Sequence, residues 1–418
     1  MSTTLIFIFV VAGAYLAAHV AFEWLARRFA IISGAEYLIL GFLLGPEVSG
    51  LISPSVVGDF APFITLALGW IGAVVGAQFY LPTLVRIPAL VFRVAFLEAI
   101  ATLVLVSTVM AVGIVWLLPV GLAEAILPAV TFGAIATVSA PSGIAVVRRK
   151  LGSREPVVRQ LEVATAIDAL VAIVAFGILL SIVNEAPQTG VRPPTPTEWA
   201  VIAIAIGLVG GALFHLFLGG ERKIDRLFIA LSGAIILASG AAAYLRLSPL
   251  FPAMLVGLIL INTSANRGEI KEVLARVERP LYFVLLIFAG AAWQSSGLVD
   301  AWLLPVLLFL IARVAAKVSG GWLAARLTGT LPALGPGWGR ALLGQGGLAI
   351  AIAFNYGAGG ERLYSNVVFT AAIVSVLLTD VSSVRLAGSV VGPLLRRRRR
   401  RPHGAAHAAG QDGGVVEV

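Results

Sequence analysis

The sequence lacks cysteine and has few charged residues. None of its 418 residues is a cysteine, and only 12% are Asp, Glu, Lys or Arg. Without cysteine there can be no disulfide, thiolate metal site or cysteine nucleophile. The charged fraction is about half the ~25% of an ordinary soluble domain, while hydrophobic residues make up 59%. Because so much apolar surface cannot be hidden from water, and disorder requires low hydrophobicity, soluble and disordered proteins are both excluded.

Long apolar runs are what the sequence contains instead. A helix needs ~20 apolar residues to cross a bilayer, whereas a β-barrel would show short alternating segments. The chain is therefore predicted to be an all-α polytopic membrane protein with about thirteen spans. The predicted spans are 5–24, 35–52, 62–80, 88–118, 122–147, 159–183, 198–218, 226–244, 248–262, 280–297, 299–326, 340–357 and 364–391.

The basic residues predict how these spans are oriented. The net charge of +9 could indicate nucleic-acid binding, but six positive charges form one run, Arg396 to Arg401. Of the thirty lysines and arginines, 25 fall in odd-numbered connections or near the C-terminus, where Arg385 and the six terminal arginines are counted, and only Arg192, Arg246 and Arg362 fall in even-numbered connections. Basic loops stay in the cytoplasm. We expect an inner-membrane protein with its N-terminus outside, a transmembrane domain over 1–395, and a basic, disordered cytoplasmic tail over 396–418, with no nucleic-acid partner.

Three charged residues lie deep inside predicted spans. Asp168 is about nine residues into the sixth span, close to the bilayer centre, and Arg313 and Lys317 share one face of the eleventh. A charge at mid-bilayer costs ~2.5–3.5 kcal/mol, which makes these residues functional candidates. Alternatively, Asp168 and Arg313 pair only to hold two helices together. Glu98 lies nearer the cytoplasmic end of its span, where snorkelling favours a structural role.

Two spans contain helix breakers at corresponding places. The fifth carries Ala140-Pro141, and the twelfth carries Gly344, Gln345, Gly346 and Gly347. Proline removes a backbone donor, and three glycines in four residues weaken a helix. The two spans are seven apart and so run in opposite directions. This pattern predicts inverted repeats whose two discontinuous helices cross at the midplane, where free carbonyls can ligate a cation.

Four segments resemble one family of transporters. They are Glu36 to Pro46, Leu66 to Leu81, Gly133 to Asp168, and the pair Leu308 to Val314 with Leu343 to Phe354. In this order they resemble the cation:proton antiporters of the sodium/hydrogen exchanger superfamily, nearest the branch that includes bacterial potassium-efflux antiporters. The resemblance implies the sodium/proton antiporter fold, a scaffold that forms a homodimer, and antiport of Na⁺ or K⁺ against H⁺.

The sequence departs from the family pattern at two places. Ile167 stands where the family usually has Asn, Gln or Asp before the carboxylate, and Ala140 stands where it often has Asp or Ser. Arg313 matches the family's Lys or Arg in the tenth core helix, although Lys317 would be the match if the helix were shifted by one turn. These departures leave open a carrier or channel for a different solute on the same fold.

The predicted mechanism is secondary antiport at a single carboxylate. Asp168 would hold either a proton or a monovalent cation, because a dry cavity favours the proton and a bound cation favours the ionised form. Hydroxyls of Thr137, Ser139 or Thr165 would complete an oxygen shell. Arg313 would offset Asp168 or the half-helix carbonyls, and electroneutral exchange is expected. No cofactor is expected. A scaffold or sensor without transport is a further alternative, whereas an enzyme is disfavoured because no nucleophile–base pair occurs.

Overall fold

The computed structural model describes residues 13, 34–117, 119–141, 144, 145, 148, 156–184, 194–218, 223–293, 303–329, 335, 337–358 and 364–379. These residues form helices and the connections between them, without a strand among them. The predicted first span, apart from residue 13, and the predicted tail 396–418 lie outside the described residues.

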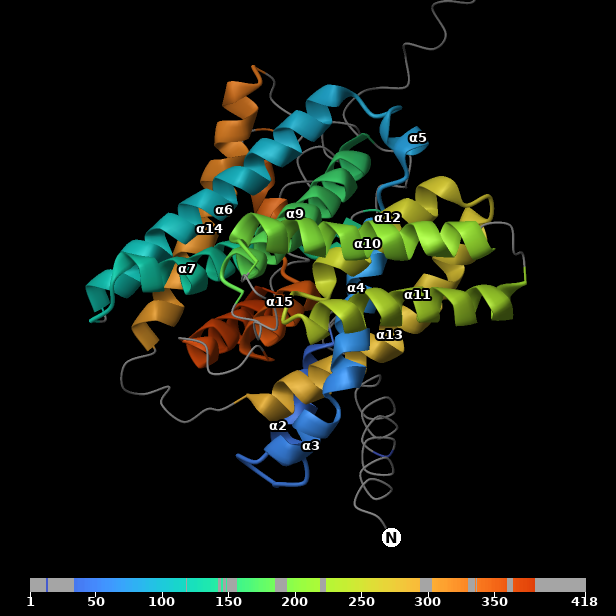
Figure 1. The fold of residues 1–418 in the computed structure, drawn as a ribbon. Coiled ribbons are helices and arrows are strands. Elements are labelled where there is room, and N and C mark those ends of the chain that lie inside the picture. Colours follow the sequence, from blue (N-terminus) through green and yellow to red (C-terminus); the bar gives the residue numbers. More distant parts are fainter. Residues whose placement is uncertain are drawn as a thin grey trace, which may run out of the picture.

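The helices fall into two groups (Figure 1). We call the first the core bundle, which gathers on the left of the view. It consists of α6 (Ala89–Leu117), α7 (Leu122–Thr137), α9 (Pro156–Ile182), α14 (Leu303–Leu327), the 3₁₀ helix η1 (Trp338–Leu342), α15 (Gly347–Ala358) and the helix Ser365–Thr379.

The second group, the scaffold, lies to the right of and below the core bundle (Figure 1). It consists of α2 (Ala35–Leu44), α3 (Pro54–Asp59), α4 (Ala61–Gly76), α5 (Leu81–Leu84), α11 (Ile224–Tyr244), α12 (Leu250–Thr263) and α13 (Arg267–Ala292). Between the groups, α10 (Pro196–Leu218) packs on α9 of the core bundle and on α11 and α12 of the scaffold.

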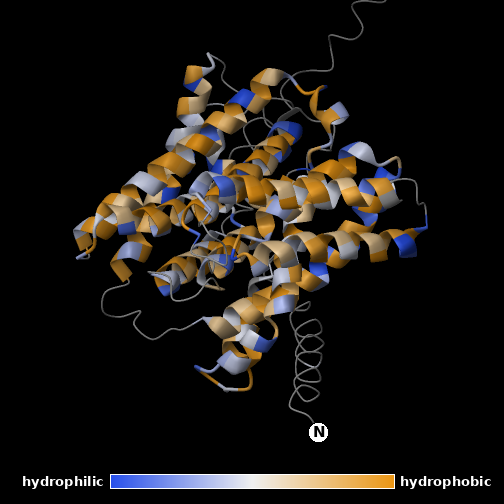
Figure 2. Cartoon of the chain, viewed as in Figure 1, coloured by the Kyte–Doolittle hydropathy of each residue, from blue (hydrophilic) through white to orange (hydrophobic). Residues whose placement is uncertain are grey.

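The prediction of an all-α polytopic membrane protein is confirmed. Five described helices are long and apolar enough to cross a bilayer: Ala89–Leu117, Val158–Ile182, Pro196–Leu216, Ile224–Tyr244 and Leu303–Leu327. Shorter apolar helices occupy most of the other predicted spans. Hydrophobic residues run along α6, α10 and α11, and hydrophilic ones gather at several helix ends (Figure 2).

One predicted boundary is wrong by about a dozen residues. The tenth span was expected to start at 280, whereas α13 starts at Arg267. Its first half is amphipathic: Ile270, Val273 and Leu274 are buried at helical spacing, while charged residues occupy most of the remaining positions. The indole of Trp70 donates a hydrogen bond to the carbonyl of Leu274 at 3.0 Å. A search for continuous apolar runs misses such a helix, because only one of its faces is apolar.

The packing of the scaffold repeats the predicted inverted symmetry. Helix α2, in the second predicted span, packs on α13 in the tenth, and α4, in the third, packs on α12 in the ninth. In an inverted repeat with a spacing of seven spans, the second span corresponds to the ninth and the third to the tenth. The pair α2–α13 therefore corresponds to the pair α12–α4. The core bundle follows the same rule, because α6 packs on α14 and α7 packs on α15.

Glycines bring the backbones of these scaffold pairs into contact. A Cβ on Gly257 of α12 would collide with the carbonyl oxygen of Ala73 in α4, and one on Gly290 of α13 would collide with that of Leu38 in α2. Small residues are the usual means of close helix packing in membranes. Both crossings therefore require glycine because of space and not because of an unusual backbone conformation.

Replacing Gly257 with alanine is expected to destabilise the protein by about 1–3 kcal/mol, the usual cost of overpacking a tight interface. Unfolding in mixed detergent micelles measures the effect. The matched control is Gly240→Ala in α11, where a Cβ would meet nothing within 4 Å. Equal stability of the two variants would contradict the close α4–α12 contact.

Candidate functional site

Two interrupted helices cross in the core bundle, as the breakers predicted. Helix α7 ends at Thr137, the chain runs non-helically from Val138 to Ala140, and helical residues resume at Pro141. In the second repeat, non-helical residues separate η1 from α15. The two breaks are joined by a hydrogen bond of 2.8 Å, in which the N–H of Ala140 donates to the carbonyl of Gly344. Backbone groups released from one helix are thus satisfied by the other.

Gln345 holds the crossing together. Its side-chain amide donates to the carbonyl of Ile135 at 2.6 Å, and its Oε1 accepts from the hydroxyl of Ser375 at 2.5 Å. Its backbone N–H donates to the hydroxyl of Thr379 at 3.2 Å. Because Gln345 is fully buried, these bonds replace the water that its polar atoms would otherwise need. The predicted break residue therefore links α7 to the helix Ser365–Thr379.

The flanking glycines make room for the crossing. A Cβ on Gly346 would lie 3.3 Å from that of Ala140, and one on Gly347 would collide with the ring of Tyr282 in α13. The side chain at position 140 therefore faces the opposite break, and a larger residue than alanine would need the second repeat to move. Pro141, at the other side of the break, is exposed.

Asp168 lies beside the first break. It is in α9, is fully buried, and its Oδ2 lies 2.5 Å from the hydroxyl oxygen of Ser139. That hydroxyl is also 2.9 Å from the carbonyl oxygen of Leu342, at the end of η1. A hydroxyl has one proton to donate, so Ser139 can satisfy only one of the two oxygens at a time. The other carboxylate oxygen of Asp168, Oδ1, is buried and has no hydrogen-bond partner among the described residues.

The charge partner of Asp168 is Lys317. Its ammonium lies 2.8 Å from Oδ2 of Asp168, and both side chains are fully buried. Lys317 is one helical turn beyond Arg313. The geometry therefore agrees with the alternative in which Lys317, and not Arg313, matches the family's Lys or Arg in the tenth core helix. The alternative in which Arg313 pairs with Asp168 is wrong. Its guanidinium donates instead to the carbonyls of Leu343 at 2.9 Å and Val138 at 3.3 Å.

Arg313 therefore makes its hydrogen bonds to the broken helices and not to the carboxylate. Val138 follows the last residue of α7, and Leu343 follows the last residue of η1. Each helix C-terminus carries roughly half a negative charge. One guanidinium contacts both of these ends, which is the position that the second of the two predicted roles for Arg313 requires.

Glu98 also belongs to this cluster, contrary to the prediction that it snorkels. It is fully buried in α6, where its Oε1 lies 3.2 Å from the Lys317 ammonium. The hydroxyl of Thr102 donates to the same oxygen at 2.9 Å. The sequence carried a signal for this position: Glu98 falls on the stripe of small and apolar residues that includes Ala95, Ala99 and Val106. A carboxylate within a helix's buried stripe faces its neighbours and not the interface.

The hydroxyls of the two predicted threonine ligands donate to backbone carbonyls and not to Asp168. Thr137 donates to the carbonyl of Gly133 at 2.9 Å, and Thr165 donates to that of Glu162 at 3.0 Å. Both bonds stay within the threonine's own helix. Of the three predicted hydroxyls, the structure brings only Ser139 into hydrogen-bond contact with the carboxylate.

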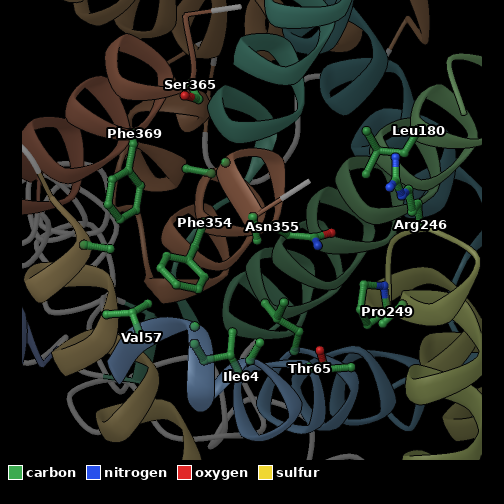
Figure 3. Close-up of a pocket in the computed structure, with 18 of the residues that line it drawn as sticks. Val57, Ile64, Thr65, Leu180, Arg246, Pro249, Phe354, Asn355, Ser365 and Phe369 are labelled. Carbon is green, nitrogen blue, oxygen red and sulfur yellow. The ribbon is translucent and has the colours of Figure 1, made fainter. Parts of the chain in front are cut away.

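A cavity of about 750 Å³ opens between the scaffold and the core bundle (Figure 3). Its lining includes Thr65 and Arg246 from the scaffold, and Leu180 and Asn355 from the core bundle. Among the described residues, Arg246 is the only charged one that lines it. Leu180 is twelve residues beyond Asp168 in α9, roughly 18 Å along the helix. Asp168 does not line the cavity, so a wall of protein separates this vestibule from the carboxylate.

Several oxygen atoms lie close together at the crossing. Among the described residues, no group of three or more His, Cys, Asp and Glu is placed to hold a metal ion. The oxygens of Asp168, Ser139 and Leu342 instead converge beside an unpartnered carboxylate oxygen. Such mixtures of carboxylate, hydroxyl and backbone oxygen line cation sites in discontinuous membrane helices.

Comparisons with known proteins agree with this arrangement. The family model described as "Sodium/hydrogen exchanger, transmembrane" matches residues 35–397. No curated protein matches the chain by sequence. A structure of the sodium proton antiporter MjNhaP1 from Methanocaldococcus jannaschii at pH 8 superposes with a TM-score of 0.69 and 16% identity, covering 93% of this chain and 100% of that one. An electron-microscopy structure of the same antiporter gives 0.63 and 16%, covering 93% and 97%. At such identity the likeness establishes the fold.

Proposed function

The chain belongs to the sodium/hydrogen exchanger family, and on that premise we propose that it exchanges one proton for one monovalent cation at Asp168. The similar antiporter from Methanocaldococcus jannaschii is described as a sodium proton antiporter. Na⁺ is therefore the first candidate substrate, and K⁺ is the second. Both are hard cations that prefer oxygen ligands.

The observation that carries the proposal is the state of the Asp168 carboxylate. It is fully buried next to the crossing of two broken helices, and its Oδ1 lacks a protein partner. An unsatisfied charged oxygen in a dry site is costly, so its retention calls for a ligand that binds there. A proton or a small cation can meet that need, and the two compete because each neutralises the same charge. Competition at one carboxylate couples the two fluxes.

Lys317 sets the cost of cation entry. Its ammonium lies 2.8 Å from Asp168, where an incoming cation would meet like charge. The cation binds only if this positive charge moves or if a proton leaves. A site that gains one positive charge and loses another keeps its net charge, so the exchange is electroneutral.

Alternating access requires the core bundle to move against the scaffold. The vestibule between them carries Leu180, Arg246 and Asn355 near even-numbered connections, which the distribution of basic residues assigns to the outside. We propose an inner-membrane protein with its C-terminus in the cytoplasm and a scaffold that pairs with a second copy. Movement of the core bundle would extend the vestibule to Asp168 on one side and close it on the other.

Proton flux in reconstituted liposomes tests this function. Outward gradients of Na⁺, K⁺, Li⁺ or Rb⁺ are imposed, and internal pH is followed with a trapped dye. Na⁺ is expected to drive proton entry with the initial rate unchanged between zero and about −100 mV, set by K⁺ and valinomycin. A cycle that moved one net charge would instead gain about 2.3 kcal/mol of driving force per 100 mV, and its rate would change with voltage.

The outcomes separate the parts of the proposal. A rate that rises steeply with voltage refutes electroneutral exchange but keeps antiport. Proton entry with K⁺ and not Na⁺ reassigns the substrate. Failure of all four cations to move protons, in liposomes that contain correctly folded protein, refutes cation:proton antiport.

A further inference from the structure

We propose that Glu98 is the residue that carries the exchanged proton, linked to the cation site through Lys317. The proposal rests on the proposed cation site at Asp168, and it replaces direct competition at that one carboxylate with competition across the cluster of Asp168, Lys317 and Glu98. Glu98 lies outside the family motifs that the sequence displays, and it contributes no ligand to the crossing of the broken helices.

The geometry places one ammonium between two carboxylates. Lys317 Nζ lies 2.8 Å from Oδ2 of Asp168, 3.2 Å from Oε1 of Glu98 and 3.5 Å from Oε2 of Glu98. All three side chains are fully buried. Three helices supply them, α9, α14 and α6, so the cluster forms only when the core bundle is assembled. The ammonium of Lys317 is therefore within ion-pair distance of both carboxylates at once.

The charge balance of the cluster requires one proton. If both carboxylates are ionised, they share the single ammonium of Lys317, which cannot neutralise two negative charges. Arg313 donates its hydrogen bonds to the carbonyls of Val138 and Leu343 and forms no ion pair with either carboxylate. A buried carboxylate without a counter-charge takes up a proton instead. The pair of carboxylates therefore holds one proton when no cation is bound.

Among the described residues, no other buried titratable group competes for this role. Helix α6 packs on α7, α9 and α14. The only titratable residue of α7 is Glu124 in its first turn. Besides Asp168, α9 carries Arg159 and Glu162, which are exposed, and Arg93 on α6 itself is exposed. Buried titratable groups near Glu98 thus reduce to Asp168, Lys317 and Arg313.

The exchange then runs through three residues. Without a cation, Lys317 pairs with Asp168 as in the structure, and Glu98 holds the proton. A cation entering at Asp168 pushes the ammonium toward Glu98, and the proton of Glu98 leaves to water on the open side. One positive charge has arrived and one has left, so the net charge of the cluster is unchanged. This explains how a site with a permanent ammonium on its carboxylate can exchange one cation for one proton without net charge.

Proton release on cation binding tests the role of Glu98. Purified protein in a weakly buffered detergent solution receives Na⁺, and a pH dye reports released protons while isothermal titration reports binding. The wild type is expected to release one proton per bound cation. Glu98→Gln is expected to bind Na⁺, with lower affinity because Lys317 has lost its second partner, and to lose the proton release. Release of one proton per cation from this variant would overturn the proposal.

The same measurement on Asp168→Asn distinguishes this inference from the proposed function. That variant should lose Na⁺ binding itself, and Na⁺ binding that persists there refutes the cation site at Asp168 whatever Glu98 does. If Glu98→Gln does not fold, Thr102→Val gives the answer, because Thr102 donates a hydrogen bond that favours ionised Glu98. Its loss shifts the pH profile of proton release toward higher pH if Glu98 carries the proton, and leaves the profile unchanged if Glu98 is only structural.

Discussion

Asp168→Asn is expected to abolish cation-driven proton movement. The asparagine amide keeps the size of the side chain but can neither hold a proton nor present a negative oxygen to the cation. A direct contact to a charged group contributes up to about 3 kcal/mol, which is about 100-fold in affinity. Since Asp168 is the proposed cation ligand, the initial rate should fall by about this factor or more in inside-out vesicles under an imposed pH gradient.

The matched control is Asp225→Asn in α11. Asp225 is an acidic residue in the first turn of α11, and it is exposed. This variant should transport like the wild type. Unchanged exchange in Asp168→Asn, at equal protein abundance in the membrane, would refute the assignment of Asp168.

Lys317→Met is expected to destabilise the protein more than any other single charge removal in the core bundle. It leaves the buried carboxylates of Asp168 and Glu98 without their shared ammonium. Breaking a buried ion pair from one side costs about 3–5 kcal/mol. The loss in free energy of unfolding should be largest at alkaline pH and should become smaller on acidification, because protons then neutralise the carboxylates. Unfolding in mixed micelles at several pH values measures this trend.

Two further variants test whether the loss of stability in Lys317→Met comes from its buried ion pairs. Lys271→Met removes an exposed lysine of α13 and should leave stability unchanged. The double variant Lys317→Met with Glu98→Gln removes one of the two stranded carboxylates and should recover part of the lost stability. Equal stability of the single and double variants would contradict the contact between Lys317 and Glu98 as a source of stability.

The architecture was predictable because the bilayer constrains a chain strongly. Apolar runs, the distribution of arginines and two matched helix breakers predicted the number, order and inverted symmetry of the helices. The start of α13 at Arg267 could not be found in this way. Its first half buries one face only, so the signal is a helical period and not a continuous apolar run.

The candidate site was predictable in its parts but not in its pairings. Asp168, Ser139, Arg313 and Lys317 could be selected because polar residues at membrane depth are costly. Which cation faces which carboxylate could not be chosen, because Arg313 and Lys317 share one helix face and differ by a single turn. Glu98 was assigned to the interface because its place in the span was counted from the cytoplasmic end, whereas its direction around α6 decides its environment.

The sequence by itself determined that this protein crosses a membrane many times, without cysteine chemistry and with few charges, and that two of its helices are interrupted. These are properties of composition and local order, and they depend on the transfer of each segment from water to lipid. The tertiary structure alone decided that Lys317 lies between Asp168 and Glu98 while Arg313 binds backbone carbonyls. That assignment depends on how α6, α9 and α14 are rotated about their own axes and on their register. A shift of α14 by one helical turn would place Arg313 where Lys317 lies.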